Sequence, residues 1–330
     1  MKGQPAMLAR AALALTLALA ACGPPPPAAV DSVACLAVAL PDPADPARGM
    51  VWIPPGAVTL GADDFYPEER PERREAVGGF WIAAHEVTNR EFEAFVRATG
   101  HVTEAEKRDP MGGQAVGGGA VFAPGLQGRD WSDISAWWRL DLAANWRQPG
   151  GEGKSIAGRP EDPVVQIAYA DALAYARWRG HDLPSEAEWE RAARGGLEGA
   201  RYVWGDETRP TGRYAANHWQ GAFPFKDTGA DGRVGRAPVG CFPPNGFGLY
   251  DMAGNVWEWT RDGWAPEGEA RGFRVIKGGS FLCSDGFCHR YRPAARQPGD
   301  ETFSTEHLGF RTVWRGPPPA PAAALTPGAR

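Results

Sequence analysis

The sequence predicts an α+β fold: a single irregular, loop-rich domain with little regular secondary structure. Its 330 residues include 43 glycines and 14 tryptophans. Glycine suits turns and positive backbone φ angles, and tryptophan contributes large buried surfaces. The regular elements that the hydrophobic patterns indicate are short, and long stretches without periodicity separate them. Such a domain relies on aromatic packing more than on long helices or sheets.

Short strands are indicated near the start of the domain. Residues 50–53 and 58–60 flank a Pro-Pro-Gly turn, and residues 80–82 form another short apolar run. Runs of this length and composition, bounded by turn residues, are typical of strands.

Three helices are indicated by capping and stop signals. Thr88 and Glu91 have the spacing of a capping box, and the helix that follows is expected to end at Gly100. A second helical pattern covers residues 171–179. A third helix is expected to begin at Ser185, where another capping box starts, and to end at a pair of glycines.

Two regions read as loops. Residues 112–128 are rich in glycine and are expected to form a mobile loop, and long loops dominate from Gly205 onward. Long structureless loops are uncommon in compact domains, so something must hold them in place. Bound ions are one candidate.

The N-terminus is expected to be a targeting segment and not part of the fold. Residues 1–21 have a positive start and an apolar stretch too short to span a bilayer, and they end at Leu19-Ala20-Ala21-Cys22-Gly23. This ending resembles a bacterial lipobox, which implies cleavage before Cys22 and lipidation of its thiol. The alternative is a simple secretory signal with a chance cysteine. No later segment is long and apolar enough to cross a membrane.

The resulting organisation has three further parts. Residues 22–49 would be a lipidated cysteine with a Pro/Ala-rich tether, residues 50–315 the folded domain, and residues 316–330 a disordered tail. We therefore expect a lipoprotein of the cell envelope that faces the periplasm, and Gly23 favours the outer membrane.

The charge pattern argues against a nucleic-acid partner. The formal net charge is −5 and the basic residues form no block, whereas binding to phosphates requires a concentrated positive surface.

Four cysteines remain if Cys22 is lipidated: Cys35, Cys241, Cys283 and Cys288. They allow three disulfide connectivities, between which the sequence does not choose. From spacing alone, Cys283 and Cys288 suit a structural disulfide at least as well as a functional pair. Cys35 and Cys241 are not expected to be catalytic, and their pairing stays open.

Several motifs resemble hallmarks of the formylglycine-generating enzyme (sulfatase-modifying factor) superfamily. The resemblance covers nearly all of residues 50–315 and implies that family's C-type-lectin-like fold. The motifs are specific for the fold but less specific for the activity, because some relatives have the same fold and do not oxidise cysteine. The motifs are His85-Glu86-Val87-Thr88-Asn89, Leu183-Pro184-Ser185-Glu186-Ala187-Glu188-Trp189-Glu190, Gly254-Asn255-Val256-Trp257-Glu258-Trp259, Lys277-Gly278-Gly279-Ser280 and Leu308-Gly309-Phe310-Arg311.

The position of the cysteine pair indicates which activity within the superfamily to expect. Cys283 and Cys288 follow Gly279-Ser280 where cysteine-oxidising members carry their active pair, and thiolates are soft ligands that select copper(I). The resemblance implies that the pair binds Cu(I) and that O2 oxidises a cysteine in a Cys-x-Pro-x-Arg segment of an unfolded sulfatase to formylglycine. It also implies that Ser280 and Trp257 line the pocket, although plain core packing of Trp257 remains an alternative.

Calcium is the other ion that the resemblance implies. One site would use Asn217, Asp231 and the carbonyls of His218 and Arg233. A second site would use oxygen atoms from Asp251, Gly254, Val256 and Glu258. Hard oxygen ligands suit Ca²⁺, but Asp231 and Glu258 also fit the role of turn caps.

The chain departs from the family pattern at several positions. Phe287 replaces a tyrosine before the second cysteine, His307 stands where the family has asparagine, and Ser284 and Asp285 replace more basic or aromatic residues. These changes bear on proton handling and peptide preference. They do not affect the cysteine pair itself.

Two other functions remain as alternatives. One is a non-catalytic envelope scaffold or binding lipoprotein with this fold. The other is a related periplasmic oxidase that acts on a siderophore-type substrate. Whichever function holds, we expect a monomer, with membrane contact through the lipid anchor only.

Overall fold

The computed structural model describes residues 35–40, 42, 44–107, 117–123, 134–265 and 271–320. These residues belong to one compact unit, Val33–Arg330. The signal segment 1–21 and the lipidation candidate Cys22 lie outside the described residues.

A three-stranded sheet joins the two ends of the domain. It has the order β1 (Met50–Ile53), β4 (Phe80–Ala83) and β11 (Val313–Trp314), with β4 antiparallel to both neighbours. The predicted strands at 50–53 and 80–82 are confirmed. The predicted strand at 58–60 is the second half of β2 (Gly56–Leu60), which pairs with β3 (Arg73–Val77) in a separate antiparallel ribbon.

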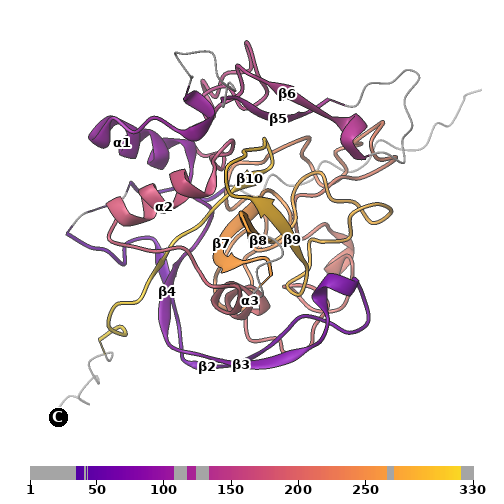
Figure 1. Cartoon of the computed structure of the whole chain (residues 1–330). Coiled ribbons are helices and arrows are strands. Elements are labelled where there is room, and N and C mark those ends of the chain that lie inside the picture. The colour runs from indigo at the N-terminus through magenta and orange to yellow at the C-terminus, as the bar shows by residue number, and fades with distance from the viewer. Residues whose placement is uncertain are drawn as a thin grey trace, which may run out of the picture. The chain divides into compact units, whose positions relative to one another are not determined.

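A four-stranded sheet forms the centre of the domain (Figure 1). Its order is β10 (Leu308–Gly309), β7 (Trp257–Gly263), β8 (Phe273–Lys277) and β9 (Arg296–Asp300). β10 runs parallel to β7, and the other neighbours are antiparallel. The loop between β8 and β9 carries both cysteines of the candidate pair.

The expected glycine-rich loop at 112–128 is wrong over part of its length. Its described residues contain β5 (Gly119–Phe122), which pairs with β6 (Trp138–Asp141) in an antiparallel ribbon. Ala120 and Val121 are buried, and this burial stabilises the strand. The glycine-rich sequence around it gives no sign of a strand. The rest of that region lies outside the described residues.

The three predicted helices are confirmed: α1 (Asn89–Thr99), α2 (Tyr169–Trp178) and α3 (Glu186–Arg194). α1 and α3 begin at the expected capping boxes, and each ends at a glycine in the left-handed conformation. α2 begins two residues earlier than expected. Single 3-10 turns are η1 (Pro67–Glu69), η2 (Glu104–Glu106), η3 (Ile134–Trp137) and η4 (Pro210–Gly212). No helix in the described ranges has the length and apolar character that a membrane span needs.

The family motifs meet in a buried polar network. Arg311 donates from Nε and Nη2 to the carboxylate of Glu258 at 2.7 Å each, and the indole of Trp189 donates to the same carboxylate at 2.7 Å. The amide of Asn255 donates to Glu86 at 3.1 Å. Buried charges require partners of this kind, so these motif residues hold the fold together and explain why the motifs specify the fold more than the activity.

The folded part begins earlier than residue 50. Cys35 forms a disulfide with Cys241, and the N–H of Leu36 donates to the carbonyl of Gly240 at 3.2 Å. The described residues of the segment 35–49, expected to belong to the tether, therefore include a covalent attachment to the domain. At the other end, the indole of Trp81 donates to the carbonyl of Pro317 at 2.8 Å, so the expected disordered tail is ordered at its start.

The Cys35–Cys241 bond is expected to contribute strongly to stability because it closes a loop with a sequence separation of 206. Replacing both cysteines with serine should lower the free energy of unfolding by about 2–5 kcal/mol. Urea unfolding followed by tryptophan fluorescence measures the change. Adding a reductant should destabilise the wild-type protein by a similar amount and leave the double variant unchanged; equal stability of the two oxidised proteins would contradict this role.

Candidate active site

The two thiols of the β8–β9 loop lie in contact. Cys283 Sγ and Cys288 Sγ are 2.7 Å apart, and both side chains are buried. Sulfurs in a disulfide are about 2.05 Å apart, so no disulfide joins the two cysteines here. The structural disulfide that spacing alone favours is not formed in this structure.

The backbone fixes the position of the pair. The N–H of Cys283 donates to the carbonyl of Ser280 at 2.9 Å, and the N–H of Cys288 donates to the carbonyl of Ser284 at 3.1 Å. Gly279 has φ +73°, and a Cβ there would approach Arg290 O and the Tyr291 backbone at 2.9 Å. The glycine before Ser280 is therefore needed so that the two arms of the loop can pass close together.

The two thiols differ in acidity. Burial raises the pKa of Cys283 well above its ordinary value, and the contact with Cys288 raises it further. The hydrogen bond from Cys283 lowers the pKa of Cys288, and the nearby Arg290 guanidinium acts in the same direction. Cys288 therefore ionises first, with Cys283 as the donor to its thiolate.

A cavity of about 480 Å³ opens onto the pair. Seven of its sixteen lining residues are aromatic, and polar side chains lie among them, which is the usual composition of a small-molecule or side-chain pocket. Ser280 and Trp257 line this cavity, as the resemblance implies. The aromatic lining is Phe122, Trp137, Trp138, Phe223, Trp257, Phe287 and Phe303.

Phe287, the residue that departs from the family's tyrosine, belongs to an aromatic cluster at the rim. Its ring centroid lies 4.7 Å from that of Phe223 in a stacked arrangement and 4.6 Å from that of Trp137 in an edge-on one. Phe287 is 41% exposed. An apolar rim of this kind reduces the water content of the space above the thiols.

His307 faces the same cavity as a neutral group. Burial lowers its pKa to about 3, and its Nδ1 lies 2.7 Å from the hydroxyl of Thr305. The side chain is uncharged over the physiological range, so it can take part in hydrogen bonding without adding charge beside the thiols.

Of three arginines that follow the pair in sequence, one reaches the cavity. Arg290 lines it while donating to Glu68 at 2.6 Å and lying over the ring of Tyr66. Arg292 pairs with Glu69 and Arg296 with Glu186. The latter two are structural ion pairs, and only Arg290 is placed to act on Cys288 or on a ligand.

The first calcium set converges in space. The N–H of His218 lies 3.3 Å from Asp231 Oδ2, and the N–H of Arg233 donates to Asp231 Oδ1 at 2.8 Å. Asn217 is adjacent in sequence and buried. Burial raises the pKa of Asp231 to about 6, and no described cationic side chain forms an ion pair with it. A desolvated carboxylate without a counter-charge fits a bound cation.

The second calcium set is less suited to bind an ion than the first, because its carboxylates already have partners. The charge of Glu258 is already balanced by Arg311, and Asp251 Oδ2 accepts a hydrogen bond from the N–H of Gly240 at 2.6 Å. Gly254 and Val256 adjoin these side chains in sequence. Across the described ranges, no three acidic, histidine or cysteine side chains group as metal ligands, so both sets depend on amide and carbonyl oxygens. The second set stays a prediction.

Sequence reasoning missed Phe122 and Phe223 as cavity residues. Phe122 lies in β5, inside the region expected to be a loop, and Phe223 lies in an irregular segment without periodicity. Only their aromatic character in a glycine-rich context could have indicated a role. The sequence contains no signal for which cavity they would face.

The chain is similar to known proteins over most of its length. The family model described as "Sulfatase-modifying factor enzyme 1-like domain" matches residues 37–316. The formylglycine-generating enzyme of Thermomonospora curvata is 47% identical over 82% of this chain and 94% of its own length. The mouse protein named inactive C-alpha-formylglycine-generating enzyme 2 is 41% identical over 81% of this chain and 85% of its own length.

A solved structure is also similar. PvdO from Pseudomonas aeruginosa superimposes with a TM-score of 0.57 and 27% sequence identity, over 80% of this chain and 93% of that one. Because the similar proteins include one named inactive, overall identity does not by itself carry an activity. Whether this chain is active depends on the residues that line the cavity.

Proposed function

The chain belongs to the sulfatase-modifying factor enzyme 1-like domain family, and from this premise we propose that it is an oxidase that converts a cysteine of a sulfatase-type protein to formylglycine, with copper(I) and O2. The main support for the proposal is the pair of buried, unbridged cysteines that lines an aromatic-rich cavity. The curated relatives that are named formylglycine-generating enzymes support it.

The thiol pair fits copper(I). Two soft thiolates on one short loop suit this ion better than hard cations, and the depressed pKa of Cys288 makes one ligand available as a thiolate. When bound, copper(I) would supply the redox centre at which O2 is activated beside the substrate sulfur. The protein supplies the two ligands, and the aromatic wall limits access of water to them.

The proposed reaction balances with a thiol reductant. The substrate side chain –CH2SH loses its sulfur as sulfide and becomes –CHO. O2 supplies one oxygen atom to the aldehyde and the other to water, with two electrons and two protons taken from two external thiols that become a disulfide. Arg290 is placed beside Cys288, and Ser280 and neutral His307 offer polar contacts to a substrate peptide in the cavity.

Binding of Cu(I) to the reduced protein tests the proposal and separates its alternatives. We expect one Cu(I) per chain, measured against a colorimetric Cu(I) chelator under anaerobic conditions. Absence of binding would favour the scaffold function. Binding without oxidation of any Cys-x-Pro-x-Arg peptide would favour an oxidase for another substrate, such as a siderophore-type compound.

We also propose that Ca²⁺ occupies the first oxygen set. Removal of the ion should leave the half-buried Asp231 carboxylate with hydrogen bonds but no counter-charge, which destabilises the loops around it. A chelator should therefore lower the melting temperature by several degrees, and added Ca²⁺ should restore it. In Asp231→Asn both effects should disappear, whereas Asp206→Asn, an exposed control, should respond like the wild type.

An exported location is proposed on two grounds. The Cys35–Cys241 disulfide is typical of an oxidising compartment, and the lipobox-like ending at Cys22 stays a prediction of lipid anchoring. Cell fractionation measures this directly. The native chain should sediment with membranes and Cys22→Ala should become soluble; a native chain found wholly in the soluble fraction would contradict the anchor.

A further inference from the structure

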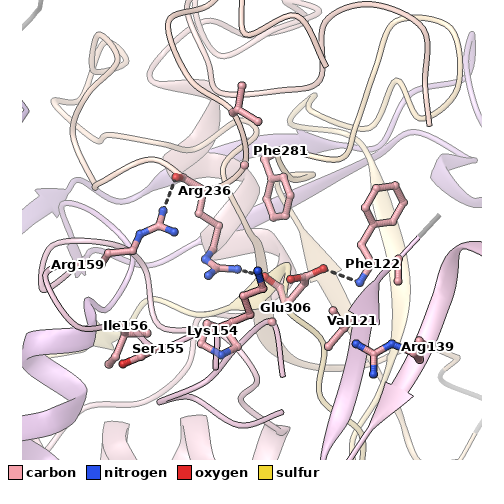
Figure 2. Close-up of a pocket in the computed structure, with 15 residues that line it drawn as sticks. Val121, Phe122, Arg139, Lys154, Ser155, Ile156, Arg159, Arg236, Phe281 and Glu306 are labelled. Carbon is pink, nitrogen blue, oxygen red and sulfur yellow. Dashed lines mark hydrogen bonds between the residues drawn. The ribbon is translucent and has the colours of Figure 1, made fainter. Parts of the chain in front are cut away.

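A second cavity, of about 460 Å³, borders the thiol cavity (Figure 2). The two share Phe122, which lines both. Its side chain therefore lies between the two cavities.

Three segments separate the two cavities. Along each segment alternate residues line opposite sides: Ala120 and Phe122 face the thiols, as do Thr305 with His307 and Ser280 with Leu282. The residues between them, Val121, Glu306 and Phe281, line the second cavity. Alternation of this kind is what extended backbone produces. The second cavity is thus built on the back of the same wall that shapes the thiol site.

The second cavity has a positive lining. Arg139, Lys154, Arg159 and Arg236 line it, against the single carboxylate of Glu306. Two of these cations are already paired, because Arg139 contacts Asp141 at 2.7 Å and Arg159 contacts Asp162 at 2.5 Å.

Two cations remain without an ion pair among the described residues, Lys154 and Arg236. Arg236 donates from Nη1 to the backbone carbonyl of Glu306 at 2.8 Å, while its Nε is buried and has no hydrogen-bond partner in the described part of the chain. A guanidinium with an unused buried donor is costly unless an acceptor arrives. In Figure 2 the Arg236 side chain extends into the cavity toward Glu306.

The charge of Glu306 acts on Arg236, but among the described residues its carboxylate forms no ion pair with Arg236 or with the exposed Lys154. One oxygen of its carboxylate accepts the N–H of Phe122 at 2.5 Å, which ties it to the wall, and burial raises its pKa. Two unpaired cations and one carboxylate leave the cavity with an excess of about one positive charge. That balance suits one added carboxylate better than a doubly charged phosphate.

We propose that this cavity is a specificity subsite that binds an acidic side chain of the polypeptide substrate, close in sequence to the cysteine held at Cys283 and Cys288. The assignment rests on the proposed function for the identity of the reacting cysteine. The glutamate or aspartate carboxylate accepts hydrogen bonds from Arg236 and Lys154, and the peptide crosses the edge at Phe122. The volume leaves room for an acidic side chain with part of its backbone.

A peptide series tests the subsite. In a set of Cys-x-Pro-x-Arg peptides, glutamate is placed at each flanking position in turn, and each has a matched glutamine peptide. Anaerobic fluorescence anisotropy gives affinities without turnover, and aerobic assays of the copper-loaded full chain give KM. At one position glutamate should bind at least about tenfold more tightly than glutamine, as expected for a charged hydrogen bond in a partly buried site.

Two variants locate the effect. In Arg236→Gln and in Lys154→Gln the glutamate-to-glutamine ratio should fall toward one, and Lys154→Gln removes no ion pair that the described structure contains. Arg97→Gln, on the exposed face of α1, should keep the ratio. A ratio near one at every position in the wild type overturns the subsite, even if all peptides are oxidised. Failure of oxidation with the binding ratio intact overturns the proposed reaction and leaves the subsite standing.

Discussion

Cys288→Ser and Cys283→Ser are each expected to abolish formation of aldehyde from a Cys-x-Pro-x-Arg peptide, with losses on the order of a thousand-fold or more. A hydroxyl is a hard, weakly acidic ligand and does not replace a thiolate toward copper(I). The fold should survive, because serine is nearly the same size as cysteine and the loop is held by backbone contacts of Ser280 and Ser284. Turnover and circular dichroism of each variant measure the two properties.

The second pair of cysteines provides the matched control. Cys35→Ser with Cys241→Ser also removes two cysteine sulfurs, but these form a disulfide outside the cavity lining. This variant should lose stability but retain turnover at a temperature where it is folded. If the Cys283 or Cys288 variant retained turnover above about a tenth of the wild type, the thiol pair would not be the reaction centre.

The largest loss of stability is expected from Arg311→Met. Arg311 and Glu258 are both fully buried, and their two hydrogen bonds of 2.7 Å are joined by the indole of Trp189. Without the guanidinium, Glu258 would be an uncompensated buried charge close to Glu86 and Asp251. Breaking such a pair costs about 3–5 kcal/mol. Urea unfolding monitored by fluorescence gives the free energy of unfolding.

Arg97→Met serves as the control for the loss of an arginine. Its contact with Glu93 is exposed on α1 at 3.5 Å, and pairs of this kind contribute about 0.3–0.5 kcal/mol. A cost below about 1 kcal/mol for Arg311→Met would show that the buried network does not hold the fold in the way described.

The helices were predictable because their signals are local. Capping boxes at Thr88 and Ser185, with glycines at the ends, fix α1 and α3 within one residue. The central sheet was not predictable in this way. β9 contains Pro298 and Gly299, which argue against a strand, yet a Cβ at position 299 would approach the ring of Trp259 at 2.6 Å. Packing against that ring selects glycine, which sequence reasoning cannot anticipate.

The candidate site was predictable only through family resemblance. Spacing alone left Cys283 and Cys288 as a disulfide candidate, and their contact without a disulfide is a property of the folded loop. The cavity residues Phe122, Phe223 and His307 come from three distant segments whose meeting depends on tertiary packing. The same is true of Arg236 and Lys154, which no sequence motif joins.

The formation of aldehyde by the intact chain tests the central claim most directly. Reduced protein loaded with one equivalent of Cu(I) is mixed aerobically with a Cys-x-Pro-x-Arg peptide and a thiol reductant, and the peptide is analysed by mass spectrometry and hydrazide trapping. We expect many turnovers to formylglycine in the wild type, none without copper, and none in Cys288→Ser. Unchanged peptide in the presence of bound copper, or equal conversion by the serine variant, would contradict the claim that this thiol pair is the centre for cysteine oxidation.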